Sequence, residues 1–500
     1  MPSTSSRPDR RWLVLPVVFI GAFMAILDVF IVNVAAPSLQ RHLGASPGQV
    51  QWVVDGYVIA YALGLITGGR LGDVYGRRRC FRLGIALFTA ASALCGAAPS
   101  PTALIGARVV QGLGAALMWP QVLSIIQVEF PAEERRKCLA QLGGVQGAGS
   151  ILGQIAGGGL IAADVLSLGW RTVFLVNVPI GIVAFVAAGR LVPESRSPSA
   201  HRLDLGGVAL GTVALLLVVV PIVEGRAAGW PWWVPAALVV AVPVGLLWLR
   251  HERRLGARGG SPLVELSLFA RRGFRIGVGL ALVFFMGVAC FFLLLALYLQ
   301  DGLGLSAIAS GAVFTPLAVA FVTGSLASPR LFARTGERVI AAGALLQAIG
   351  MAGVIASVAG GAGSPTPALI ASLVIVGAGN GIVVPSVIGA VLRSVPTPDA
   401  GSASGVVSTA MQIGNALGVA SAGVIFFGVL GGAHGAHAYG RAFAIAIAWC
   451  LASASVSALL ALRLARSDRD VLERSPQVQA GQRPVGAPAL AQGLDLGHRR

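Results

Sequence analysis

Three ionisable residues lie inside long apolar runs of the chain, where an isolated charge is unfavourable. Asp28 and Asp55 are the acids, and Arg108 the base, that fall within such runs. At a helical rise of 1.5 Å per residue, all three lie in the same half of their runs, within about two turns of depth. Buried ionisable groups mark proton or substrate pathways in membrane proteins, so these residues are candidates for proton coupling. A purely structural ion pair is the alternative.

Asp28 is the deeper of the two acids. Burial disfavours its ionised form whereas a nearby Arg108 favours it, so Asp28 could alternate between protonated and ionised states. Asp55 lies closer to the end of its run and is the alternative proton acceptor. The six histidines fall outside the apolar runs, which argues against a histidine relay.

A short segment rich in glycine and arginine follows the second apolar run. Residues 69–79 read Gly-Arg-Leu-Gly-Asp-Val-Tyr-Gly-Arg-Arg-Arg. Its glycines favour a short loop with a tight turn. Asp73 stands alone among several arginines and could lock onto a neighbouring helix end through charge-assisted hydrogen bonds. The alternative is a simple anchor of positive charge. The candidate gating residues are Gly69, Arg70, Asp73, Gly76, Arg77 and Arg78.

These residues must be positioned by membrane-spanning helices. Hydrophobic residues make up 56% of the 500, charged residues only 11%, and the mean hydropathy is +0.81. Such a chain cannot cover a water-facing surface. Fourteen apolar runs are long enough to cross a bilayer as helices. They lie near 13–36, 50–69, 81–98, 102–126, 139–163, 172–192, 205–223, 232–250, 274–299, 307–328, 338–359, 367–392, 401–430 and 440–464.

The positions of the basic residues test this count. With the N-terminus in the cytoplasm, 32 of the 37 basic residues fall in cytoplasmic segments and four in outer loops, with Arg108 inside a span. Cytoplasmic loops of membrane proteins carry an excess of Lys and Arg. The net charge of +17 therefore reflects topology, and nucleic-acid binding is not expected. Both termini are predicted to be cytoplasmic.

Several other protein classes are excluded by missing motifs. Lys137 is the single lysine, and Cys138 follows it, so the chain has no phosphate-binding P-loop. The five cysteines are scattered, and neither a nucleophile elbow nor a zinc-protease motif is present. We therefore expect no enzyme activity, no cofactor and no metal. If the chain is a transporter, the missing P-loop means that an ion gradient must drive it.

Two features suggest an internal repeat. Arg-Leu followed by glycine recurs from residues 70–76 to residues 330–336, and a Gly-x-Gly pair followed by proline recurs from 112–120 to 379–385. Repeats of this kind build transporters with substrate sites near the membrane midplane. The predicted organisation is a cytoplasmic N-terminus (1–12), a six-helix half (13–192), two inserted linker helices (205–250), a cytoplasmic linker (251–273), a second six-helix half (274–464) and a disordered tail (465–500).

Several motifs resemble those of one transporter family. Residues 69–79 resemble the signature loop of the major facilitator superfamily, and residues 104–114 resemble its span-four motif. Residues 27–37 and 170–181 resemble motifs of its fourteen-helix drug–proton antiporter branch. The resemblance covers residues 13–464 in order. It implies the major-facilitator fold, with two six-helix halves and two inserted helices.

The span-five antiporter motif shows one departure from that branch. Residues 149–158 carry Gln154 where the family motif has proline. Glycines four residues apart still share one helix face and permit close packing. The motif residues are Gly149, Gly153, Gln154, Gly157 and Gly158. Polar and aromatic residues in the spans either join helices or line a substrate cavity. The cavity candidates are Asn33, Tyr57, Gln111, Trp119, Phe292 and Asn380.

The resemblance implies proton-driven export of drug-like, antibiotic or dye-like compounds. Expected partners are a small-molecule substrate, protons and the lipid bilayer, and the protein is expected to be a monomer in a bacterial cytoplasmic membrane. The strong bias to arginine over lysine also favours a bacterial source. The alternatives are transport of an endogenous metabolite or peptide, and a non-transporting receptor. Short loops, without room for a sensory domain, argue against the receptor.

The topology makes a direct prediction. Reporter domains fused at residue 260 and at residue 500 should both report a cytoplasmic location, because the basic residues cluster on that side. An external location for either fusion would contradict the fourteen-span arrangement.

Overall fold

The computed structural model describes residues 11–163, 167–197, 203–225, 228–260, 262–359, 364–396, 399–431, 433 and 435–473. Within these ranges every regular element is helical. The predicted all-α membrane fold is therefore confirmed. Thirteen helical segments are long and apolar enough to cross a membrane, and α6 is a fourteenth long helix of 32 residues.

The first half of the bundle contains six membrane-length segments. The sixth is broken into a 3₁₀ turn (Gly169–Arg171) and two helices. The helices are α2 (Val14–Leu43), α3 (Pro47–Tyr75), α4 (Arg77–Gly96), α5 (Pro101–Glu129), α6 (Ala132–Ala163), α7 (Thr172–Leu175) and α8 (Asn177–Leu191).

The second half repeats this plan. A 3₁₀ turn (Leu266–Ala270) precedes it, and a π-helical turn (Tyr298–Gly302) extends its first helix. The helices are α11 (Arg272–Leu297), α12 (Ala307–Thr335), α13 (Arg338–Ala359), α14 (Pro367–Arg393), α15 (Ala400–Leu430) and α16 (Ala436–Glu473).

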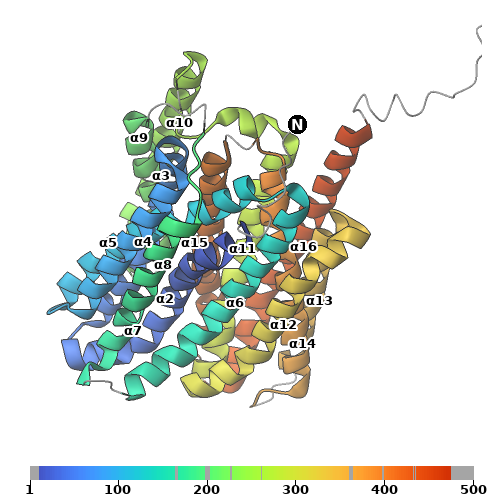
Figure 1. The fold of residues 1–500 in the computed structure, drawn as a ribbon. Coiled ribbons are helices and arrows are strands. Elements are labelled where there is room, and N and C mark those ends of the chain that lie inside the picture. Colours follow the sequence, from blue (N-terminus) through green and yellow to red (C-terminus); the bar gives the residue numbers. More distant parts are fainter. Residues whose placement is uncertain are drawn as a thin grey trace, which may run out of the picture.

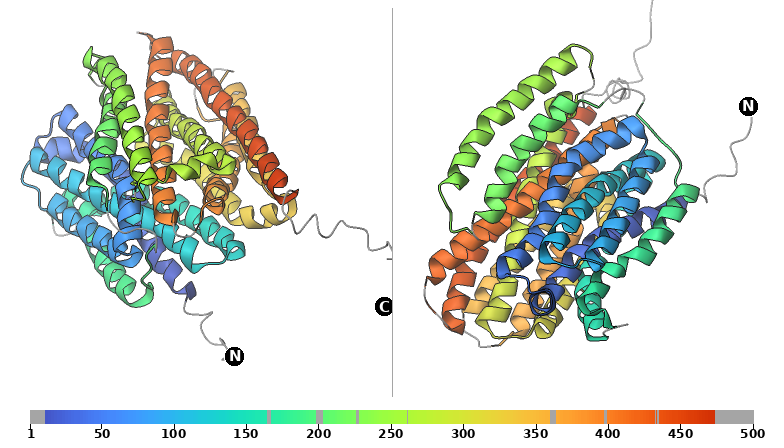
Figure 2. Two further views of the ribbon diagram at one scale, coloured as in Figure 1. Left: turned by 90° about the horizontal axis from the view of Figure 1, so that it is seen from above. Right: turned by 90° about the vertical axis from the view of Figure 1, so that its left-hand side faces the viewer.

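The two inserted helices, α9 (Leu205–Glu224) and α10 (Trp233–Ala257), form an antiparallel pair beside the bundle (Figures 1 and 2). Only α9 of the pair packs closely against the bundle, where it contacts α3 of the first half and α15 of the second. α10 packs mainly on α9 and exposes a face rich in valine and leucine. A face of this composition is suited to lipid.

Local sequence explains where several helices begin. Ser46 caps α3 in a capping box with Gln49, and Ser100, Ser306 and Thr366 accept hydrogen bonds from the first turns of α5, α12 and α14. These side chains satisfy backbone N–H groups that have no partner within the helix. Proline follows the cap in α3, α5 and α14, where its missing N–H is harmless.

Two sequence predictions are wrong at the level of local structure. Residues 69–75, predicted as a loop, are the last two turns of α3, and only Gly76 (φ +112°) interrupts the helix before α4 begins at Arg77. Gly69 and Gly72 instead permit close packing, against Gly401 and Gln121. Similarly, α16 continues through Glu473, so residues 465–473 of the predicted disordered tail are helical.

The two halves meet closely at one end of the bundle, which we call the arginine-rich end because Arg70, Arg77, Arg136 and Arg393 lie there. Glycines form much of the seam: Gly69 faces Gly401, and Gly405 faces the backbone of α3. Hydrogen bonds from Gln127 to the Leu392 carbonyl (2.8 Å) and between Ser124 and Ser404 (3.3 Å) join the halves at the same end.

The glycine seam yields a prediction. A side chain at Gly69 would overlap the Gly401 carbonyl, so Gly69→Val should prevent the halves from closing. Cysteines placed at Ser124 and Ser404, in a chain without its five native cysteines, report closure by forming a disulfide. We expect the crosslinked fraction to fall severalfold in Gly69→Val.

Gly106→Val is the matched control for this experiment. Gly106 is also a helical glycine, but a side chain there would meet open space. Crosslinking should stay at the level of the unsubstituted chain. Equal crosslinking in Gly69→Val and Gly106→Val would contradict the role of the seam.

Candidate functional site

A buried ion pair lies at the centre of the first half. Arg108 of α5 donates from Nη1 to Oδ2 of Asp28 on α2 at 2.5 Å. The Asp28 side chain is fully buried and that of Arg108 is 1% exposed. Arg108 also donates from Nε to the Val53 carbonyl of α3 at 2.9 Å. The guanidinium therefore holds three helices together, and each charge has the partner that burial in a bilayer requires.

Three polar side chains complete the surroundings of Asp28. Gln111 of α5 and Asn177 of α8 donate to Oδ1 of Asp28 at 2.8 and 3.3 Å. Both amides also donate to Ser92 of α4, at 3.2 Å in each case. Asp28 thus accepts hydrogen bonds from donors on α5 and α8. This network joins the Asp28 carboxylate to side chains of α4, α5 and α8.

Aromatic rings cover the arginine. The guanidinium carbon of Arg108 lies 4.2 Å from the ring centroid of Tyr57 and 5.8 Å from that of Phe174. Both rings are buried. Cation–π contacts of this kind stabilise a desolvated guanidinium.

Asp55 lies outside this network, although its predicted depth matches. It accepts a hydrogen bond from Gln51 Nε2 at 2.6 Å, and its carboxyl group lies within hydrogen-bonding reach of the Glu224 side chain on α9. The sequence analysis missed Glu224, because it falls just beyond the end of an apolar run. An acid next to a run boundary was the only signal that the sequence offered.

The glycines of the span-five motif pack α6 onto α2. Gly149 contacts Phe23 and Ile26, and Gly153 contacts the backbone at Leu27 and Ile31, on either side of Asp28. Gly157 is buried. Gln154 and Gly158 lie outside the residues whose side-chain surroundings the structure describes, as does the cavity candidate Asn33. The close α6–α2 contact therefore lies along the stretch of α2 that carries Asp28.

The second cluster lies at the arginine-rich end, around Asp73. Its fully buried carboxylate accepts hydrogen bonds from the backbone N–H groups of Gly401 (3.1 Å) and Ser402 (2.9 Å) in the first turn of α15. Arg77 donates to the same carboxylate at 2.7 Å. The N-cap residue of α15, Asp399, makes no side-chain cap of its own. Asp73 thus caps a helix of the opposite half, where the helix dipole favours an anion.

Other charges surround this cap. Buried Arg70 interacts electrostatically with both Asp73 and Asp399. Burial raises the pKa of Asp399, and nearby Glu265 adds to this shift, while Arg70 and Arg271 oppose it. On the other side of the cap, Glu194 accepts from the Arg78 backbone N–H at 3.2 Å. The connection from α8 to α9 is thereby held against the start of α4.

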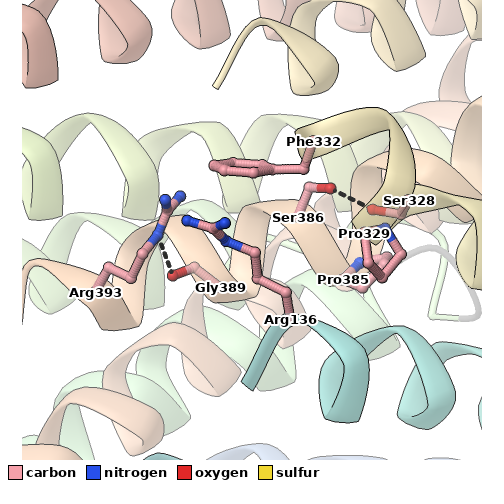
Figure 3. Close-up of a pocket in the computed structure, with 8 residues that line it drawn as sticks. All are labelled: Arg136, Ser328, Pro329, Phe332, Pro385, Ser386, Gly389 and Arg393. Carbon is pink, nitrogen blue, oxygen red and sulfur yellow. Dashed lines mark hydrogen bonds between the residues drawn. The ribbon is translucent and has the colours of Figure 1, made fainter. Parts of the chain in front are cut away.

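The corresponding segment of the second half, residues 330–336, makes different contacts from those around Asp73. Figure 3 shows the guanidinium groups of Arg136 and Arg393 gathered at the Phe332 ring, where their carbons lie 3.7 and 4.9 Å from the ring centroid. Arg393 also forms an ion pair with Glu337. The adjoining cavity measures about 20 Å³, room for one water molecule. Arg136 comes from α6, so this contact also joins the two halves.

The cavity candidates do not gather at one place. Tyr57 and Gln111 belong to the Asp28 network, whereas Trp119 and Asn380 are buried in α5 and α14. Phe292 stacks on Phe314 with 5.9 Å between ring centroids. Among the described residues, no group of three His, Cys, Asp or Glu side chains is arranged to hold a metal ion.

Comparison with known proteins gives a consistent result. The model of the Major Facilitator Superfamily matches residues 18–419. The chain is 40% identical over 424 residues to a Streptomyces coelicolor protein named "Probable actinorhodin transporter", covering 84% of this chain and 73% of that protein. It is 36% identical over 425 residues to a puromycin resistance protein of Streptomyces alboniger (83% and 81%). A cephamycin export protein of Amycolatopsis lactamdurans is 36% identical over 413 residues (80% and 81%).

Solved structures support the fold. The human organic anion transporter MFSD10 superposes with a TM-score of 0.66 at 16% identity, covering 91% of this chain and 100% of that one. A proton:xylose symporter, XylE, superposes with a TM-score of 0.62 at 17% identity, covering 90% and 95%. These likenesses concern the fold alone.

The buried ion pair makes a prediction about stability. Asp28→Leu leaves Arg108 buried without its partner, which costs about 3–5 kcal/mol. Thermal unfolding in detergent should shift to a clearly lower temperature. The double variant Asp28→Leu with Arg108→Met removes both charges and should be less destabilised than Asp28→Leu alone. If the double variant lost as much stability as Asp28→Leu and Arg108→Met lose in sum when made separately, direct pairing would be contradicted.

Proposed function

The chain belongs to the major facilitator superfamily, and on this premise we propose that it exports small antibiotic-like molecules in exchange for protons. It is a membrane transporter and not an enzyme. Relatives at 36–40% identity carry names of antibiotic transport, export or resistance. These names support export, and the class of substrate, as the function of this chain.

The observation that carries the proposal is the buried Asp28–Arg108 pair with its polar network. Asp28 can exist in two states. Ionised, it pairs with Arg108 and accepts from Gln111 and Asn177; protonated, it loses most of the attraction of Arg108. Because these partners lie on α5 and α8 and are bonded in turn to α3 and α4, a change in its protonation alters the packing of the whole half. Reciprocal binding of a proton and a cationic substrate at such a site gives antiport.

The arginine-rich end is proposed to face the cytoplasm, with both termini on that side. This orientation puts the basic residues where the positive-inside rule expects them. The structure is then closed toward the cytoplasm, with Asp73 capping α15 and the glycine seam in contact. Opening toward the cytoplasm to load substrate requires that this cap be released.

The close contact between α6 and α2 supports a link between these two events. Gly153 packs on the backbone of α2 beside Asp28, and α6 runs from there to the seam, where Gly143 faces Ser325 of the second half. A shift of α2 on protonation of Asp28 would thus pass through one rigid helix to the contact between the halves.

Export assays in an efflux-deficient bacterial host test the proposal. Expression of the chain should lower intracellular accumulation of at least some compounds in a panel of antibiotics and dyes. Asp28→Asn should reduce this export to the background level, because the residue can no longer bind and release a proton. The control Asp301→Asn makes the same change on an exposed acid and should export normally. Export by Asp28→Asn at the unsubstituted rate would contradict the proposal.

Substrate-induced proton release from purified protein in detergent identifies the carrier. Release should vanish in Asp28→Asn. Release that persists there but vanishes in Asp55→Asn would transfer the role to Asp55. Release that survives in the double variant would exclude both carboxyl groups.

A further inference from the structure

The inserted pair of helices brings a second acid against the first half of the bundle. α9 ends at Glu224, at the end of the bundle opposite the arginine-rich end. The connection to α10 carries Trp230 and Trp232, which are both exposed, and α10 itself begins with Trp233. Tryptophan is enriched where a membrane meets water, so this connection marks the outer interface. Glu224 lies six residues before Trp230 in the sequence.

Glu224 meets Asp55 of α3 at this interface. The two side chains lie within hydrogen-bonding reach of each other, and Gln51 donates to Oδ2 of Asp55 at 2.6 Å. Asp55 is 7% exposed. Oε1 of Glu224 is also buried and receives no hydrogen bond from any donor in the described part of the chain. The contact therefore joins two carboxyl groups and lacks one donor.

One proton shared between the two carboxyl groups would stabilise this contact. Ionised carboxylates have only acceptor oxygens, so two of them repel each other on contact. One protonated carboxyl group can donate to the other, and the pair then carries a single negative charge. Glu224 is moreover at the C-terminal end of α9, where the helix dipole disfavours an anion. Both effects favour retention of a proton.

In the part of the chain that the structure describes, the nearby charges do not offer an alternative partner. Arg108 of α5 reaches the backbone of α3 at Val53, but its guanidinium pairs with Asp28 of α2. On α3 itself, Tyr57 covers Arg108, and the other packed tyrosine is Tyr61. The charged residues of α10 in the described ranges, from Arg250 to Arg254, and Asp399 at the start of α15, lie at the arginine-rich end.

We propose that Asp55 and Glu224 form a carboxyl pair that holds one proton at the outer end, with one member supplied by the inserted helices. α9 touches α3 of the first half and α15 of the second, so movement between the halves changes the Asp55–Glu224 contact. Separation of the two acids releases the proton, and their approach binds it. The proposal rests on proton-driven export in assigning this proton to transport. The inserted helices are then part of the proton pathway.

Infrared spectroscopy of the purified full-length protein in lipid nanodiscs tests the pair. At neutral pH the wild type should show the C=O band of one protonated carboxyl group that disappears in Glu224→Gln. The same band should disappear in Asp55→Asn, because the remaining carboxyl group ionises once it no longer shares the proton. The double variant should show no further loss of C=O absorption beyond that of either single variant. Asp301→Asn, which alters an exposed acid at the same end, should retain the band.

Three infrared results would overturn the proposal. The band could be missing from the wild type, or it could persist in either single variant. Alternatively, the carboxylate bands of the wild type could shift on adding Na⁺ or Mg²⁺ and stay unchanged in Glu224→Gln, which would assign the pair to a metal cation. The measurement needs neither substrate nor export, so its result is independent of whether the protein exports drugs.

A second measurement covers variants that fail to fold. Cysteines at positions 55 and 224, in a chain lacking its five native cysteines, should form a disulfide readily if the two side chains are in contact. Cysteines at 55 and 213 serve as the control, because residue 213 lies three turns earlier on an exposed part of α9. Equal crosslinking of the two pairs would overturn the contact itself.

Discussion

The contact between the two halves at the arginine-rich end depends on a carboxylate of one half that caps a helix of the other. Asp73 satisfies two backbone N–H groups at the start of α15, which would otherwise lie buried without partners. Because Asp399 makes no cap of its own, α15 depends on the opposite half for this role. The cap can be released only if water or another acceptor reaches those N–H groups. Closure of the seam and solvation of one helix end are thus a single event.

The two halves share a plan but distribute charge differently. The buried ions Asp28, Arg108 and Asp73 all belong to the first half, whereas charged side chains in the described part of the second half lie near the ends of its helices. In the repeated segment, Ala333 and Glu337 stand where Asp73 and Arg77 stand in the first half. The second contact between halves therefore relies on arginines stacked on Phe332 rather than on a buried carboxylate. The fold is symmetric, but its chemistry is not.

The features that depend only on position along the chain could be predicted from the sequence. Apolar run length located the spanning helices, and depth along those runs correctly suggested that Asp28 and Arg108 could meet. Depth alone says nothing about which face of a helix a residue occupies, so Asp55 was grouped with them although it faces α9. Glu224 could not be predicted because it lies just beyond the end of an apolar run, and its contact with Asp55, about 170 residues away in sequence, forms only in the folded protein. The end of α3 was mistaken for a loop because its glycines serve close packing, which only the tertiary contact reveals.

The glycine seam has a consequence for the speed of the cycle. Where large side chains interlock, two surfaces can part only after many rotamers have changed, and each gap left behind forfeits dispersion contacts. At this seam, Gly69 meets Gly401 and Gly405 meets the backbone of α3, so the contact is smooth and has few side-chain torsions to reset. At these glycine contacts, separation of the halves therefore requires few changes of side-chain rotamer.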